Sequence, residues 1–109
     1  MTIAISGTNG LLQAYDYQAL TTGFSYTFAA GTQNLIINPA GTLATGTITM
    51  PASPTDGMTI RFSSSQIITS LTVSANTGQS IVSAVTTLTA GGGAVYLYRA
   101  SNTTWYRTV

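Results

Sequence analysis

Residues 35–62 constrain the fold more than any other stretch of this sequence. They hold three short apolar runs, at 35–37, 48–50 and 58–62, separated by two clusters rich in Pro, Gly, Ser, Thr and Asp. Short runs that contain β-branched residues and are bounded by turn-forming residues are typical of strands in an all-β domain. The stretch therefore predicts consecutive strands joined by turns.

The same pattern continues on both sides of this stretch. Phe24, Tyr26 and Phe28 alternate with small polar residues, and Ile48 and Met50 alternate with threonines, so each segment has one apolar face for a core. Turn signals recur at a spacing of about 8–12 residues, which favours an antiparallel β-sandwich or a jelly-roll-like barrel. We expect strands at 24–28, 33–38, 45–50, 58–63, 67–73, 81–82, 85–88, 94–99 and 104–109.

A chain of 109 residues is expected to form one domain. We assign residues 24–109 to the β-sandwich and residues 1–23 to an extended N-terminal arm, with room for one helical turn. The arm has too few apolar residues for a core of its own. Two placements stay open: addition to the sheet of a neighbouring subunit, or an N-terminal strand of its own sandwich.

The predicted hairpin at 94–109 is apolar on both faces. Val95 and Leu97 alternate with Tyr96 and Tyr98, and Trp105 stands beside Tyr106. A sheet with one wet side would show one polar face, so we expect one face to cover the core and the other to meet a loop, the arm or another subunit.

Charge is scarce along the whole chain. Charged residues make up 5% of the sequence, against about 25% in an ordinary soluble domain. The 44% of hydrophobic residues argues against disorder. Little charge keeps copies apart, so we interpret the surface as one used in assembly, the alternative being a monomer solubilised by its hydroxyl groups. The charged residues are Asp16, Asp56, Arg61, Arg99 and Arg107.

The residue types for most catalytic sites are missing. The chain has no His, Cys, Lys or Glu, so a serine triad lacks its base and a zinc site lacks its ligands. Asp16 and Asp56 are far apart in sequence, and Asp56 lies in a turn context, which disfavours a calcium site. We therefore expect no enzymatic activity, no metal and no cofactor.

Nucleic-acid and membrane binding are also disfavoured. A net charge of +1 neutralises few phosphates, although the aromatic and arginine residues of 96–107 resemble a platform for single strands. Arginines that stack on aromatic rings at a protein interface are the simpler interpretation. No run approaches the roughly 20 apolar residues that a membrane-spanning helix needs.

Three segments resemble a β-sandwich module of tailed-bacteriophage virion proteins. They read L-I-I-N-P-A-G-T-L-A-T-G-T-I-T-M-P-A-S-P-T-D-G-M at 35–58, I-T-S-L-T-V-S-A-N-T-G-Q-S-I at 68–81 and V-Y-L-Y-R-A-S-N-T-T-W-Y-R at 95–107. The resemblance covers residues 33–108. The module recurs in small capsid cement (decoration) proteins and in parts of tail fibres.

The resemblance implies a structural, non-enzymatic protein that is typically a homotrimer. Because the chain ends directly after the module and carries no shaft repeat, we expect a cement protein on the capsid exterior that bridges major capsid subunits. The alternative is a tail-fibre or receptor-binding tip that binds host-surface glycans through aromatic and Asn/Gln-rich loops. The residues expected at the contacts are Ile3, Ile5, Leu11, Leu12, Tyr15, Tyr17, Tyr96, Tyr98, Trp105 and Tyr106.

Overall fold

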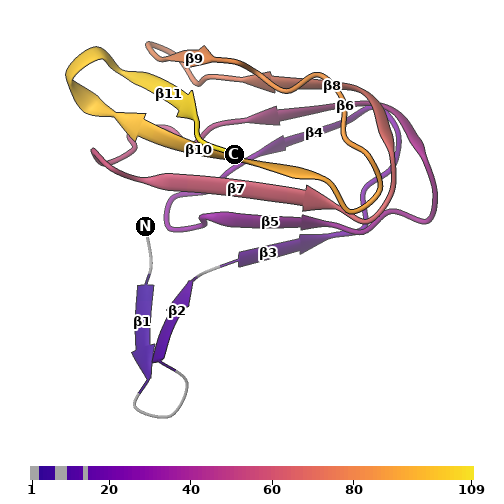
Figure 1. The fold of residues 1–109 in the computed structure, drawn as a ribbon, viewed down its shortest axis with the longest axis horizontal. Coiled ribbons are helices and arrows are strands. Elements are labelled where there is room, and N and C mark those ends of the chain that lie inside the picture. The colour runs from indigo at the N-terminus through magenta and orange to yellow at the C-terminus, as the bar shows by residue number, and fades with distance from the viewer. Residues whose placement is uncertain (1–2, 7–9, 14) are drawn as a thin grey trace.

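The computed structural model describes residues 3–6, 10–13 and 15–109, with side chains from Tyr15 onward. The described part is built almost entirely from strands, which confirms the all-β prediction (Figure 1). The strands are β1 (Ile3–Ser6), β2 (Gly10–Gln13), β3 (Tyr15–Gln18), β4 (Phe24–Thr27), β5 (Asn34–Ile37), β6 (Leu43–Thr49), β7 (Thr59–Ser64), β8 (Ile68–Ser74), β9 (Ser80–Val82), β10 (Gly93–Arg99) and β11 (Thr104–Arg107).

From β3 to β9 the chain alternates between two sheets. Strands β3, β5, β7 and β9 belong to a six-stranded sheet with the order β3-β5-β7-β10-β11-β9, whereas β4, β6 and β8 form a three-stranded sheet in that order. Each turn of the chain thus adds one strand to each sheet, and the neighbours β3-β5-β7 and β4-β6-β8 are all parallel. The result is a β-solenoid-like stack of coils (Figure 1).

Among the described strands, the predicted antiparallel pairing holds only for the β1–β2 hairpin and for β10. Strand β10 is antiparallel to both β7 and β11, and the β10–β11 hairpin falls where the sequence predicted it. In the coils, pairing is parallel because each strand reaches its neighbour only after crossing to the other sheet and back. That crossover gives a parallel pair, whereas a short direct turn gives an antiparallel one.

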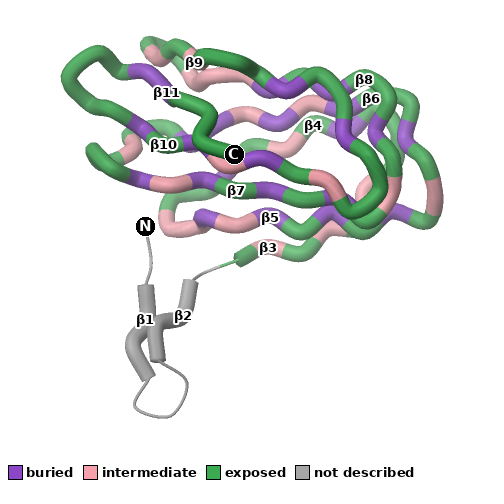
Figure 2. Tube along the Cα trace, in the orientation of Figure 1, coloured by how far each residue is buried: buried purple, intermediate pink, exposed green. Residues whose placement is uncertain are grey.

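The core lies between the two sheets. Inward positions of successive coils stack on one another: Leu35 is the register partner of Phe62, and Ile48 is the partner of Val73. All four side chains are buried. Figure 2 shows buried and exposed positions alternating along most strands, as a period of two requires.

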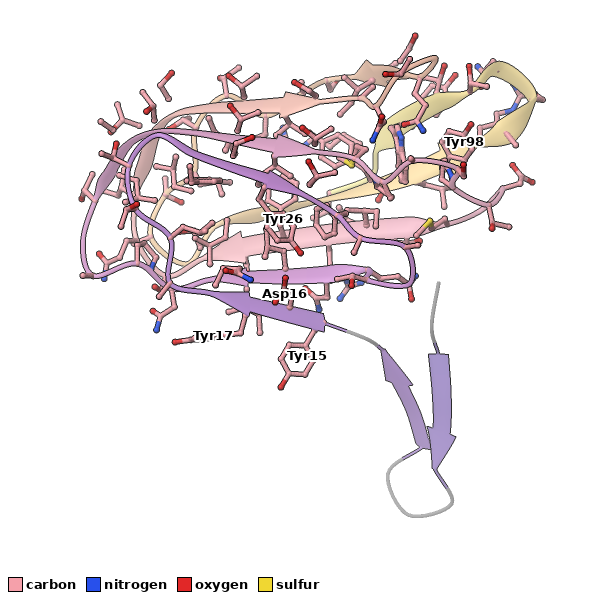
Figure 3. The ribbon with its side chains drawn as sticks, turned by 180° about the vertical axis from the view of Figure 1, so that it is seen from behind. Tyr15, Asp16, Tyr17, Tyr26 and Tyr98 are labelled. Carbon is pink, nitrogen blue, oxygen red and sulfur yellow. The ribbon has the colours of Figure 1, made fainter. Side chains whose placement is uncertain are left out.

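The first coil has polar residues at the equivalent inward positions. Asp16 is the register partner of Leu35, and Tyr26 is the partner of Ile48. The Tyr26 hydroxyl donates to Oδ2 of Asp16 over 2.8 Å, and Nε2 of Gln18 donates to the same carboxylate. Figure 3 shows Asp16 and Tyr26 pointing toward each other across the gap between the sheets. An inward-pointing charge on an edge strand discourages the addition of a further strand, so this coil ends the stack.

Two boundaries differ from the prediction. Strand β3 pairs with β5 of its own chain, so the sheet begins at Tyr15 rather than at residue 24, and this part of the arm is a strand of its own sheet. No helical turn occurs in the arm among the described residues. The segment predicted as a strand at 85–88 makes an isolated antiparallel bridge, between Leu88 and Ile68, and one further backbone hydrogen bond, from Leu71 to Thr86, so it lies beside β8 without forming a regular strand.

Candidate interaction surface

The outward side of the six-stranded sheet carries most of the exposed apolar side chains. Within residues 15–109, eight large hydrophobic side chains are exposed, and seven of them lie on or beside this sheet, the exception being Ile67. Tyr15 and Tyr17 are 66% and 54% exposed on β3, and Figure 3 shows both rings pointing away from the body. We call this surface the apolar face. Its outward residues include Tyr15, Tyr17, Ile36, Arg61, Val82, Val95, Leu97 and Tyr106.

The register of the sheet arranges these side chains in rows. One row runs Tyr17, Ile36 and Ser63 across β3, β5 and β7. A second row runs Tyr15, Asn34, Arg61 and Val95 across β3, β5, β7 and β10. A third runs Thr59, Leu97, Tyr106 and Val82 across β7, β10, β11 and β9. Neighbours in a row are one strand spacing apart, about 4.8 Å, so the apolar groups form two patches, one on β3 and β5 and one on β10, β11 and β9, with the polar outward positions of β7 between them.

A groove of about 480 Å³ lies in the middle of the apolar face, and its wall includes Asn34, Ile36, Arg61, Val95 and Val109. Because Ile60 and Phe62 point into the core, Arg61 points outward, and its side chain is exposed. Within residues 15–109 its guanidinium donates no hydrogen bond to another residue. The groove therefore combines an available cation with apolar walls.

The two aspartates are both held elsewhere by hydrogen bonds. Asp16 points inward to Tyr26 and Gln18. Asp56, in the turn before β7, accepts a 2.9 Å hydrogen bond from the backbone N–H of Ala100. The outward positions of the six-stranded sheet thus carry Arg61 and Arg99 without an acidic side chain among them, and the apolar face is positively charged.

The outward side of the three-stranded sheet has a different chemistry. Apart from the exposed Ala44 of β6, its outward strand positions are serines and threonines, and none is buried. The register places them in rows, such as Ser25, Thr47 and Thr72. Hydroxyl groups on a sheet surface are readily hydrated, so this side suits contact with solvent. We call it the hydroxyl face, and it consists of Ser25, Thr27, Thr45, Thr47, Thr49, Ser70, Thr72 and Ser74.

Three of the predicted contact residues belong to the core instead. Tyr96 and Trp105 are 0% exposed and Tyr98 is nearly as buried. The Tyr96 ring stacks on Phe62 at 6.1 Å, and the Tyr98 and Trp105 rings are 5.0 Å apart. The prediction that these three side chains form a surface patch is wrong, because the tyrosine face of the hairpin is its inward face.

Hydrogen bonds satisfy the polar side-chain atoms of Tyr96 and Trp105. The Tyr96 hydroxyl donates to the carbonyl of Ser83 and accepts from the N–H of Val85, both at 3.0 Å. The indole N–H of Trp105 donates to Oε1 of Gln79 over 2.9 Å. Burial raises the pKa of Tyr96, although the Val85 hydrogen bond and the charge of Arg107 oppose the shift. The segment at 79–85 is thereby fastened to the hairpin.

The remaining predicted contact residues divide into two groups. Tyr15, Tyr17 and Tyr106 lie on the apolar face, and Tyr106 is 36% exposed. The side chains of Ile3, Ile5, Leu11 and Leu12 lie outside the described part of the chain. Sequence reasoning missed Ile36, Val82 and Arg61. The sequence did hold a signal for Arg61. It lies between Ile60 and Phe62 in β7, so if those two apolar side chains point into the core, Arg61 must point outward.

No group of three or more carboxylate, His or Cys side chains gathers among the described residues. The one helix found there is the three-residue 3₁₀ helix Ala100–Asn102, so the described chain has no helix that could cross a membrane.

No protein-family model matches this sequence, and no curated protein is similar enough to match it.

Proposed function

We propose that this chain is a structural, non-enzymatic protein of a tailed-bacteriophage virion, a capsid decoration protein that lies on the outer shell. In this proposal it binds as a homotrimer and stabilises the shell by bridging major capsid subunits. The resemblance of the segments at 35–58, 68–81 and 95–107 supports the virion assignment. The solenoid-like stack with its antiparallel hairpin is then a variant of the sandwich module to which those segments are similar.

The observation that carries this proposal is the separation of two surface chemistries. The apolar face concentrates exposed side chains such as Tyr17, Ile36 and Leu97, whereas the hydroxyl face has Ser and Thr at nearly all of its outward strand positions. Contiguous exposed apolar patches with polar surroundings mark protein interaction sites. A decoration protein needs one side that binds the shell and another that faces water, and these two faces meet that need.

Binding would act mechanically rather than chemically. Each contact that one trimer makes with two shell subunits must be broken before those subunits separate, which raises the cost of opening the shell. The driving force is apolar area removed from water, at roughly 25 cal/mol per Å² before the entropic costs of association.

The second candidate is a receptor-binding tip that binds host-surface glycans. The exposed Tyr15 and Tyr17 rings favour it, because they stand two residues apart on one strand and aromatic rings can stack on sugars. The aliphatic side chains of Ile36, Leu97 and Val82 on the same face favour a protein partner instead.

The copy number of this chain in purified virions tests the proposal. Quantitative mass spectrometry against the major capsid protein should find near-stoichiometric amounts if the chain decorates the shell. A few copies per particle would support the fibre or tip position, and absence from the particle would contradict both. Native mass spectrometry of the purified chain should find three copies per complex.

A further inference from the structure

We infer that the apolar face recognises a protein surface that presents carboxylates among apolar side chains, and that Arg61 binds one of those carboxylates in the central groove. This inference rests on the proposed function and names the chemistry of the shell surface that the chain would contact. It also assigns a specific role to a residue that the motifs do not single out.

Arg61 occupies a central position on the apolar face. It stands in the second row of the face, between Asn34 on one side and Val95 on the other. The groove beside it is also lined by Ile36 and Val109. A partner that fills this groove with apolar groups must remove the guanidinium from water. That removal is costly unless the partner supplies an opposite charge and hydrogen-bond acceptors.

The shape of the guanidinium points to a carboxylate. Arginine presents its N–H donors in a planar fork that matches both oxygens of a carboxylate, and such charge-assisted pairs are stronger than neutral hydrogen bonds. Within residues 15–109 no acidic side chain shares the face with Arg61, because Asp16 points inward and Asp56 bonds to Ala100. A carboxylate side chain that pairs with Arg61 would therefore come from the partner.

The charge distribution also argues against a second copy of this chain as the occupant. Packing the same face of two copies together would oppose the arginines of β7 and β10 to one another. The only acidic side chains in the sequence are Asp16 and Asp56, which are already engaged. Like charges across an interface are unfavourable, so the apolar face suits a different, acidic protein.

The first test measures the affinity of the full-length protein and its variants for capsid shells from which this chain is missing. We expect Arg61→Gln to weaken binding about tenfold, the effect of losing one charge-assisted hydrogen-bonded pair. Arg61→Lys should fall between, because it keeps the charge but loses the fork. The control is Thr72→Glu, which lowers the net charge by the same one unit on the hydroxyl face and should leave binding within about twofold, since surface charges distant from the contact are screened. Equal losses in Arg61→Gln and Thr72→Glu would overturn the inference.

A second measurement does not need the shell. The probe is a blocked peptide of alternating leucine and glutamate, with a glutamine analogue as its control, titrated into ¹⁵N-labelled protein. The glutamate peptide should shift the amide resonances of Ile36, Arg61 and Val95, and the glutamine analogue should shift them much less. Identical shifts from the two peptides, or shifts confined to the hydroxyl face, would contradict a carboxylate site.

The two measurements separate the inference from the function it rests on. If the unaltered chain fails to bind shells but the glutamate peptide shifts the groove resonances, the decoration role is wrong and the carboxylate site stands. If shells bind the unaltered chain and Arg61→Gln equally well, the decoration role stands and the site is wrong. Groove shifts produced by a short DNA oligonucleotide and not by the glutamate peptide would replace the carboxylate with phosphate and refute the inference.

Discussion

The two sheets of this protein are alike inside and different outside. Both sheets place large apolar side chains at their inward positions, such as Phe62 of β7 and Ile48 of β6. Their outward positions diverge into an apolar, arginine-bearing face and a face made almost entirely of Ser and Thr. Core packing demands the same chemistry from both layers, but nothing in folding demands an exposed Leu97 or Tyr17. The difference is therefore the basis for proposing the apolar face as the side that contacts another molecule.

The contrast between inside and outside is strongest on β11, where two neighbouring aromatic residues have opposite placements. Trp105→Ala should lower the free energy of unfolding by about 3–5 kcal/mol, because it empties a fully buried site. Tyr106→Ala should cost about 0.5 kcal/mol or less, as expected for a surface position. Urea unfolding of both variants measures the difference, and similar losses would mean that the two sides of the hairpin are not distinguished as described.

The interior of the three-stranded sheet depends on a missing side chain at Gly46. A Cβ there would lie 2.0 Å from Cε2 of Phe24, so the Phe24 ring occupies the space over the glycine. Gly46→Ala should destabilise the fold by about 1–3 kcal/mol through overpacking. Gly41→Ala is the control, since a Cβ at Gly41 has no neighbour within 4 Å. Equal melting temperatures for the two variants would show that the ring can move aside.

The first coil differs from the inner coils through the Tyr26–Asp16 hydrogen bond. Tyr26→Phe should cost about 1–2 kcal/mol at neutral pH, because it removes a hydrogen bond to a carboxylate between the sheets. Burial and the neighbouring Asp16 carboxylate raise the pKa of Tyr26. Tyr98→Phe is a control, since the Tyr98 hydroxyl takes no part in the hydrogen bonds of the first coil.

The raised tyrosine pKa values give the fold a predicted alkaline limit. The folded state holds the phenolic protons of Tyr26 and Tyr96 more tightly than the unfolded chain does. This contribution is complete below the ordinary tyrosine pKa of about 10 and is lost as the pH rises above it. The free energy of unfolding should thus fall above about pH 10, and less steeply in Tyr26→Phe than in the unaltered protein. A parallel fall in both would exclude Tyr26 as the source.

Exchanging the chemistry of the two outer faces should have the smallest effect on folding. Leu97→Thr and Thr72→Val each alter one exposed side chain, so the free energy of unfolding should change by about 0.5 kcal/mol or less. Only Leu97→Thr should weaken binding to shells, because only it removes apolar area from the apolar face. A matching loss in Thr72→Val would show that both faces make contacts.

Sequence patterns located most strands because the signal for them is local. Alternation with a period of two marks 24–27 and 59–64 without any knowledge of their partners, and Pro and Gly mark the turns between them. The segment at 85–88 carried the same signal but meets β8 only at one bridge and one further backbone hydrogen bond, which is too little regular pairing for a strand. The apolar face was only partly predictable: its tyrosines on β3 were identified, whereas Ile36 and Val82 were not.

The sequence by itself determined that this chain is all-β, where it turns, and that β10 and β11 form a hairpin, since each depends on neighbouring residues. Only the tertiary structure decided that the coils pair in parallel and that Tyr96 and Trp105 point inward while Leu97 and Tyr106 point outward. Alternation in the sequence shows which side chains share a face of a strand. It does not show which face points inward when both faces of the hairpin are apolar. The choice is made by segments distant in sequence, among them the one at 79–85, whose Gln79, Ser83 and Val85 bind the polar atoms of the inward aromatic side chains.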